Sequence, residues 1–156
     1  LRYAIEPSLI EVELTESAVI DRSALVTSEL ATLRDFGFKL MIDDFGTGHS
    51  SMAQLHRLDV DVLKVDQAFT RALSDGGDEG RLLFSAILSM ANALKMGVVA
   101  EGVETVEQWR VLQSLYCDEI QGHLVSEAVA ASEMAQLILK RVLFSPPSSP
   151  GHLIPI

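Results

Sequence analysis

Charged and amide side chains recur in this sequence where short apolar runs end. They are Glu13 with Glu16, Asp43 with Asp44, Lys64 with Asp66, Glu101 with Glu104, and Gln121. Taken singly, such a residue is more often a helix cap or an ion-pair partner than a ligand. Together they predict a shared site, because ligands of parallel α/β folds bind at the carboxyl ends of the strands.

Carboxylates gathered in one place repel one another unless cations lie between them. Oxygen-only ligands favour Mg²⁺ or Mn²⁺ over zinc, and the four histidines show no metal-ligand spacing. Two adjacent aspartates can bridge a pair of ions, with Asp43 shared and Asp44 facing the second ion. Two such ions stabilise the attacking and leaving oxygens of a phosphodiester displacement. Lys64 can then neutralise phosphate charge or orient the attacking water.

The string Asp-Asp-Phe-Gly-Thr-Gly at residues 43–48 is the most specific local signal. Two acids followed by two glycines predict a tight turn that directs carboxylates into a pocket. The string is not a phosphate-binding P-loop, because no Gly-Lys-Ser or Gly-Lys-Thr follows it.

Five short segments are expected to be the strands that position these residues. They cover residues 9–14, 38–42, 60–65, 98–100 and 120–125. Stretches of helical period separate them. We expect a helix from Ser23 to Gly37, a long helix whose inner face carries Leu83, Ile87, Met90 and Leu94, a helix opened by a Thr105–Gln108 capping box, and a last helix capped by Ser132 and ending near residue 142.

Nearly continuous apolar strands that alternate with amphipathic helices predict an α/β fold with a parallel sheet covered by helices. We count five strand–helix units. A doubly wound sheet could use five, whereas a closed barrel needs eight strands and usually about 250 residues. The 156-residue chain is expected to form one domain over residues 1–143, followed by a Pro/Ser-rich tail over residues 144–156.

The composition narrows the class of function. The formal net charge of -10 argues against binding a nucleic-acid polymer, which needs a basic surface. The acidity fits either a soluble surface or carboxylates that hold cations, which in turn hold an anionic substrate. No apolar run reaches the roughly 18 residues of a membrane span. Cys117 is the only cysteine, so no internal disulfide can form and a reducing, cytoplasmic setting is expected.

Five strings in succession resemble the signatures of the bacterial EAL domain family. They are ELTES at 13–17, DDFGTGHSS at 43–51, LKVD at 63–66, AEGVE at 100–104 and QG at 121–122. Their order and spacing also match, so the resemblance runs from about residue 7 to about residue 143. It implies a TIM-barrel-like (β/α)8 fold. It also implies phosphodiesterase activity that hydrolyses the second messenger cyclic di-GMP to linear pGpG, with Mg²⁺ or Mn²⁺ as cofactor.

The resemblance implies a role for each residue of the acidic cluster. Glu13 and Asp43 would be ligands of a first metal ion. Asp43, Asp44 and Glu101 would serve a second ion. Lys64 would contact the attacking water, and Glu101 is the alternative candidate for a general base.

Four further residues take supporting roles by the same resemblance. Gln121 would position the water or complete the surroundings of the second ion. Glu16, Asp66 and Glu104 would lie behind the ligands, with Glu16 and Glu104 holding the Asp-Phe-Gly-Thr-Gly turn at residues 44–48. Family members also use that turn near a dimer interface, so a homodimer is expected.

The sequence departs from the family at two places. The Glu-Ala-Leu string that names the family and its asparagine metal ligand are absent, and both belong to strands that would precede Leu1. We therefore expect a partial barrel of about five units, an incomplete two-metal site, and hydrolysis at least about a hundredfold slower than in a longer version. Residues 123–128 read His-Leu-Val-Ser-Glu-Ala where the family usually has tyrosine, an aromatic residue and a basic-Pro pair beside the nucleotide, which bears on substrate affinity.

Other functions stay open on the sequence alone. The chain could be an EAL-like module that binds cyclic di-GMP or a protein partner without hydrolysis, or a different metal hydrolase or lyase on a similar barrel. Upstream sensory or GGDEF-type domains, within a longer and membrane-anchored protein, would fit the family. The open edges of a partial sheet also predict that a second copy pairs with it, or that the tail at residues 145–156 covers it.

Overall fold

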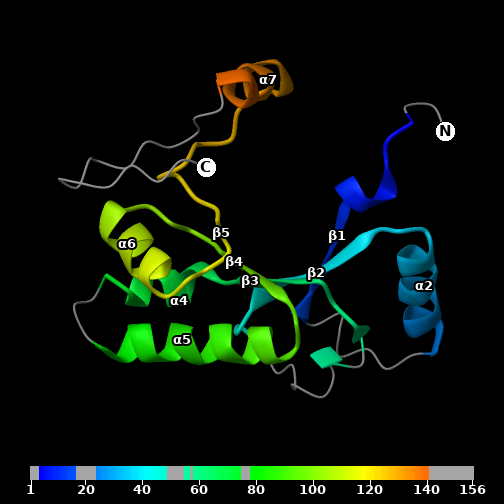
Figure 1. Ribbon diagram of the computed structural model, residues 1–156, viewed down its shortest axis with the longest axis horizontal. Helices are drawn as coiled ribbons and strands as arrows, with labels where there is room; N and C mark the ends of the chain where they lie inside the picture. Colours follow the sequence, from blue (N-terminus) through cyan, green and yellow to red (C-terminus); the bar gives the residue numbers. More distant parts are fainter. Residues whose placement is uncertain (1–3, 17–23, 49–54, 57, 75–77, 141–156) are drawn as a thin grey trace.

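A five-stranded parallel sheet forms the centre of the molecule (Figure 1). The computed structural model describes residues 4–16, 24–48, 55–56, 58–74 and 78–140. The strands follow one another across the sheet in chain order: β1 (Glu11–Thr15), β2 (Lys39–Phe45), β3 (Val62–Val65), β4 (Gly97–Ala100) and β5 (Glu119–Ile120). All four pairings are parallel, as the alternation of apolar runs and helical stretches predicts.

Helices connect these strands and flank the sheet. They are η1 (Pro7–Leu9), α2 (Ala24–Asp35), α4 (Gln67–Ala72), α5 (Asp78–Ala93), α6 (Val106–Ser114) and α7 (Ala131–Lys140). Figure 1 shows α2 beside the β1–β2 side of the sheet, α4, α5 and α6 around β3 to β5, and α7 standing apart. None of the helices in the described part of the chain is long and apolar enough to cross a membrane.

The core lies between the central strands and the long helix α5. Leu63, Val98, Phe84 and Leu112 are all at most 2% exposed and belong to one apolar cluster. β3 and β4 are four residues long, and three residues of each strand are buried, as expected for strands covered on both faces. The side chains of β1, in contrast, alternate between exposed and half-buried. The middle of the sheet is therefore the rigid support for whatever lies at its ends.

Several element boundaries differ from the sequence-based expectation. β5 ends at Ile120 instead of continuing to residue 125, because the chain turns at Gly122, whose carbonyl accepts a hydrogen bond from the Val125 N–H at 3.0 Å. The inner face of α5 carries Phe84, Ile87 and Ala91, whereas Leu83 is 49% exposed. The expected cap of the last helix was also wrong, since α7 begins at Ala131 and Ser132 lies within it.

The connection between β3 and α5 contains a short helix that the sequence did not predict. α4 is only six residues long, and its N-cap is Asp66, whose carboxylate accepts a hydrogen bond from the Ala68 N–H at 2.8 Å. The Thr105–Gln108 capping box of α6 is confirmed, with both reciprocal hydrogen bonds present. Ser23 and the tail at residues 144–156 lie outside the described residues.

Asp61 and Asp118, just before β3 and β5, each accept a hydrogen bond from the backbone of the neighbouring strand. Asp61, which precedes β3, accepts a hydrogen bond from the first buried N–H of β2, that of Leu40, at 2.9 Å. Asp118, which precedes β5, accepts one from the Val98 N–H of β4, also at 2.9 Å. Each side chain ties the start of one strand to the segment that enters the next strand.

The hydroxyl of Thr70 in α4 is fully buried and has no hydrogen-bond partner among the described residues. Replacing it with valine keeps the branched shape and removes the cost of desolvating that hydroxyl. We expect Thr70→Val to raise the free energy of unfolding by about 1 kcal/mol. Urea denaturation measures the change. Thr32→Val in α2 is the control, because the exposed Thr32 hydroxyl already donates to the Ser28 carbonyl at 2.9 Å. A lower midpoint for Thr70→Val would contradict the expectation.

Burial raises the pKa of the Cys117 thiol to about 11, and the charge of Asp118 adds to this, while backbone hydrogen bonds such as that to Glu119 oppose it. The unfolded chain loses this proton near pH 9, so deprotonation favours unfolding between about pH 9 and pH 11. The free energy of unfolding that the protonated, buried thiol contributes is therefore fully present below pH 9 and is lost as the pH rises to 11. We expect the wild type to lose stability relative to Cys117→Ala across this window. Urea midpoints at pH 8, 9 and 10 test it, and a constant difference between the two proteins would contradict it.

Candidate metal centre

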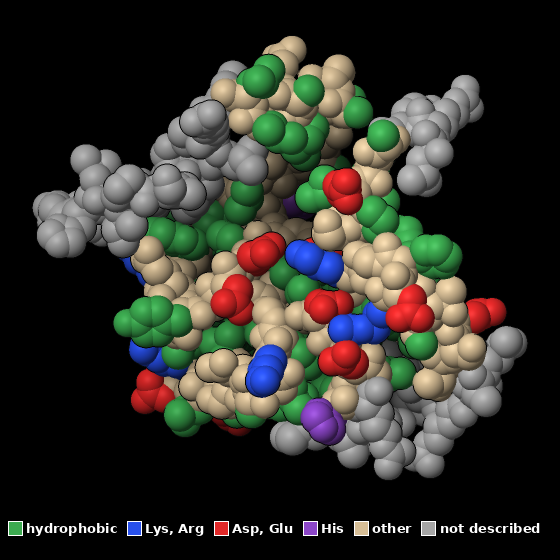
Figure 2. Space-filling view, turned by 45° about the vertical axis from the view of Figure 1, so that its right-hand side comes forward, with side chains coloured by type: hydrophobic (Ala, Val, Ile, Leu, Met, Phe, Trp, Pro, Cys, Tyr) green, Lys and Arg blue, Asp and Glu red, His purple; other side chains and the backbone are tan. Residues whose placement is uncertain are grey.

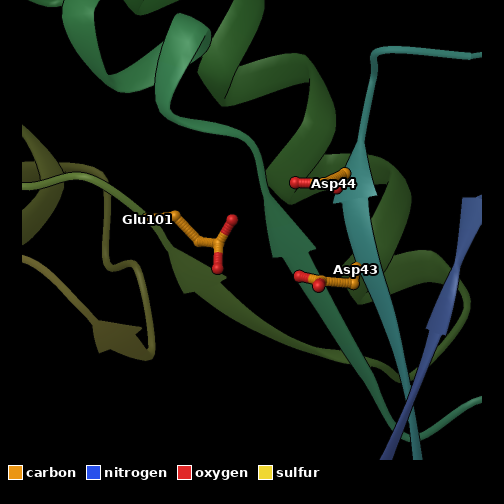
Figure 3. Close-up of side chains that lie close together, drawn as sticks. All are labelled: Asp43, Asp44 and Glu101. Carbon is orange, nitrogen blue, oxygen red and sulfur yellow. The ribbon is translucent and has the colours of Figure 1, made fainter.

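The sequence places two aspartates next to each other, yet both side chains point to the same side of β2 (Figure 3). Neighbouring residues of a regular strand point to opposite faces. The pairing of β2 with β3 is irregular between Ile42 and Phe45, and Asp44 has a φ of 54°. Such a bulge re-aims a side chain at the end of a strand. Contrary to the expected strand end at residue 42, β2 therefore continues through both aspartates to Phe45.

Glu101 completes a group of three carboxylates. It directly follows β4, and its N–H donates to the Val65 carbonyl of β3 at 3.1 Å. One carboxylate oxygen from each of Asp43, Asp44 and Glu101 lies within 4.8 Å of the others. Figure 3 shows the Glu101 side chain pointing from the end of β4 toward both aspartates. Three hard oxygen donors at this spacing suit Mg²⁺ or Mn²⁺.

Lys64 of β3 lies among the same carboxylates. Its Nζ is 2.7 Å from Asp43 Oδ1, 2.7 Å from Glu101 Oε1 and 3.1 Å from Glu13 Oε1, and its side chain is only 8% exposed. Burial lowers the pKa of Lys64, but the hydrogen bonds to Asp43, Glu101 and Glu13 outweigh burial and hold the pKa above its usual value. The residue is therefore a buried ammonium that offsets part of the carboxylate charge.

Glu13 joins this cluster from β1, through Lys64. It is paired in register with Met41 of β2, and its side chain is 51% exposed. Among the described residues, it is not part of the group of three that could share one ion. The structure thus brings Glu13, Asp43, Asp44, Lys64 and Glu101 to one end of four adjacent strands.

Glu16 lies behind the aspartates and holds the turn that follows them. Its carboxylate accepts hydrogen bonds from the Gly46 N–H at 3.1 Å and from the Gly48 N–H at 2.8 Å, and the residue is 4% exposed. A buried carboxylate that accepts two backbone N–H groups fixes a turn firmly, because hydrogen bonds to charged groups are the stronger kind. This contact joins the end of β1 to the end of β2.

Three other candidate residues are not part of the acidic cluster in the described structure. Asp66 caps α4, and Glu104 is exposed, with its N–H bound to Gln108 Oε1 at 2.8 Å. Gln121 is exposed, and its backbone N–H donates to the Ala100 carbonyl of β4 at 2.8 Å. Their roles stay predictions.

Ion pairs also occur away from the cluster. Figure 2 shows acidic and basic side chains close together across one face of the molecule. Arg34 of α2 lies 2.9 Å from Asp59, and Lys39 of β2 lies 3.6 Å from Glu11 of β1. Ion pairs that solvent screens contribute little to stability. Substitution of the half-exposed Lys39 is therefore a suitable control for substitution of the buried Lys64.

Comparisons with known proteins agree on one family. The family model described as EAL domain matches residues 1–128. The cyclic di-GMP phosphodiesterase PA2567 of Pseudomonas aeruginosa is 36% identical over 132 residues, which are 85% of this chain and 22% of that protein. The chain spans about a fifth of the length of the curated relatives it matches.

Solved structures give the same result. A structure described as the PaMucR phosphodiesterase in complex with c-di-GMP superposes with a TM-score of 0.78 at 35% identity, covering 85% of this chain and 53% of the other. The manganese and cyclic di-GMP complex of BlrP1 from Klebsiella pneumoniae gives 0.72 at 36% identity, covering 79% and 31%. These α/β structures have the TIM-barrel-like fold that the motif order implied, and the described residues of this chain contain five parallel strands of it. The chain belongs to the EAL domain family.

Proposed function

We propose that the acidic cluster hydrolyses cyclic di-GMP to linear pGpG in bacterial second-messenger signalling. The observation that carries the proposal is the group of three carboxylates from Asp43, Asp44 and Glu101, with the buried Lys64 ammonium among them. The relative PA2567 bears the name of a cyclic di-GMP phosphodiesterase, which supports the same substrate.

In this proposal Asp43, Asp44 and Glu101 hold divalent cations, and Glu13 contributes to the first of two ions. Bound Mg²⁺ or Mn²⁺ supplies an activated water and charge stabilisation at the phosphoryl oxygens. The BlrP1 structures with manganese and with calcium support a hard divalent cation, and the choice between Mg²⁺ and Mn²⁺ belongs to the proposal.

The protein's own groups then act on the water and the phosphate. The water oxygen forms a bond to phosphorus, the bond from phosphorus to the leaving ribose oxygen breaks, and one proton passes from the water toward that oxygen. Lys64, whose Nζ contacts the carboxylates of Asp43, Glu101 and Glu13, would neutralise phosphate charge or orient the water. Glu101 is the candidate base by the family resemblance, and its 2.7 Å ion pair with Lys64 would hold its carboxylate in place. Gln121 would help to position the water from the turn that follows β5.

The supporting residues and partners are part of the same proposal. Glu16 would keep the turn of residues 43–48 in place, while Glu104 and Asp66 would act from behind the ligands. A homodimer through that turn, a cytoplasmic location, and sensory or GGDEF-type neighbours in a longer protein would fit. The bifunctional diguanylate cyclase/phosphodiesterase MucR of Pseudomonas aeruginosa is a relative with both activities in its name.

The test measures cation binding and turnover separately. Calorimetric titration with Mn²⁺ uses this chain, and chromatography of cyclic di-GMP and pGpG uses both this chain and a version extended upstream of Leu1. We expect Asp43→Asn to weaken Mn²⁺ binding and abolish pGpG formation. Asp35→Asn, an exposed aspartate at the end of α2, is the matched control. Unchanged Mn²⁺ binding in Asp43→Asn would refute the metal centre. Mn²⁺ binding without pGpG in either version would favour a module that binds without hydrolysis.

A further inference from the structure

The first turn of α4 lies between the two turns that carry the metal-binding carboxylates. Asp43 and Asp44 precede the turn at Gly46, and Glu101 precedes the turn at Gly102. Both glycines have positive φ, 101° at Gly46 and 64° at Gly102. α4 contributes a side chain against each of them, and neither contact was apparent from the sequence.

Phe69 occupies the space beside Gly46. A Cβ added at Gly46 would overlap the Phe69 ring and lie 2.5 Å from its Cζ. Phe69 is partly buried and packs against the central apolar cluster, so the ring cannot swing freely away. The turn after β2 is thus held between the Glu16 carboxylate, which binds the Gly46 N–H, and the Phe69 ring.

Gln67 occupies the space beside Gly102 in the same way. A Cβ added at Gly102 would lie 2.5 Å from Gln67 Cβ and 3.4 Å from its Cα, so the contact involves the part of the residue nearest the backbone. The Gln67 amide oxygen accepts a hydrogen bond from Arg71 Nη2 at 2.7 Å, one helical turn along α4. The turn after β4 therefore rests on the helix itself.

Backbone contacts and the cap make this helical turn stiff. The Asp66 carboxylate accepts from the Ala68 N–H at 2.8 Å, and the Phe69 N–H donates to the Asp66 carbonyl at 3.1 Å. The Glu101 N–H donates to the Val65 carbonyl, one residue before the cap. A stiff element that touches both turns sets their separation better than two independent loops would.

We propose that the first turn of α4 is a spacer for the acidic centre: Phe69 and Gln67 are positioning residues that fix the distance between the Asp43–Asp44 pair and Glu101. The inference rests on the proposed function, since the spacing matters only if these carboxylates share a cation. Asp66 then acts through the helix that it caps, not through the cation.

The experiment is a Mn²⁺ titration of the folded protein by calorimetry, with circular dichroism as a check on folding. Phe69→Leu shortens the side chain beside Gly46, and Gly102→Ala pushes the other turn away from Gln67. We expect each to raise the Mn²⁺ dissociation constant by about tenfold, the lower end of what loss of a supporting contact costs. Phe36→Leu is the matched control, because Phe36 is 65% exposed near the amino end of β2.

A purely structural role for Phe69 would lower the melting temperature and leave the dissociation constant of the folded protein unchanged. The spacer is therefore overturned if Phe69→Leu and Gly102→Ala both bind Mn²⁺ as the wild type does. Asp43→Asn in the same series separates the two hypotheses. If Asp43→Asn loses Mn²⁺ binding while Phe69→Leu and Gly102→Ala both keep it, the metal centre stands and the spacer fails. If Asp43→Asn also keeps wild-type binding, the metal centre itself fails.

Discussion

Glu101→Gln is expected to lower pGpG formation by at least about a hundredfold, because loss of a group behind a ligand already costs roughly 10–100-fold and Glu101 is a direct candidate ligand. The variant keeps the shape of the side chain and removes its charge. It takes one of three carboxylates from the group within 4.8 Å and breaks the 2.7 Å ion pair with Lys64. Mn²⁺ affinity should fall together with turnover.

The control for Glu101 is Glu107→Gln, an exposed glutamate in the first turn of α6. Both substitutions remove one negative charge, so a general electrostatic effect would appear in both. Rates of pGpG formation are compared at saturating Mn²⁺, in the version extended upstream of Leu1. Equal rates for Glu101→Gln and the wild type would remove Glu101 from the catalytic site.

Lys64→Met is expected to have the second large effect, and it should separate stability from catalysis. Without the ammonium, the carboxylates of Asp43, Glu101 and Glu13 face one another with no cation of the protein between them. Breaking a buried ion pair by removing one partner typically costs 3–5 kcal/mol, and roughly 3 kcal/mol applies here because Glu13 is half exposed and screened by solvent. We expect this loss of unfolding free energy in metal-free buffer.

Added Mn²⁺ should reverse part of that loss, because a ligand that binds the folded state stabilises it. The stabilisation by Mn²⁺ is expected to be larger in Lys64→Met than in the wild type, while pGpG formation stays low. Lys39→Met is the control, since Lys39 is half exposed and its pair with Glu11 should contribute less than about 1 kcal/mol. Urea denaturation with and without Mn²⁺ measures both variants. Equal losses for Lys64→Met and Lys39→Met would show that the buried ammonium does not balance the cluster.

The sequence predicted the end of the sheet at which the charged residues meet, and the reason is simple. In a parallel sheet all carboxyl ends lie on one side, so a residue that ends an apolar run is placed without knowledge of the contacts. This argument located Glu13, Asp43, Lys64 and Glu101 correctly. It failed for β5, where the expected strand extended to residue 125 although the chain turns at Gly122.

Other features depend on contacts between distant segments and could not be read from local pattern. The bulge at Asp44 lets two consecutive side chains share one side, which contradicts the alternation that a strand pattern assumes. The hydrogen bonds from Gly46 and Gly48 to Glu16 span some thirty residues. The helix α4 is too short to show a helical period, so its contacts with the two glycine turns were missed.

The repeated aspartate ties at the amino ends of the strands have a consequence for how this molecule can change. Asp61 and Asp118 anchor β2 and β4 at the end opposite the carboxylates, through the segment that enters the following strand. These hydrogen bonds fix the register of the strands at their amino ends, so the turns at the carboxyl ends need not fix it. A substitution in those turns is therefore expected to alter the acidic centre without shifting the strands against one another. Conversely, loss of the Asp61 or Asp118 hydrogen bond is expected to disturb the alignment of the strands and leave the contacts of the Gly46 and Gly102 turns in place.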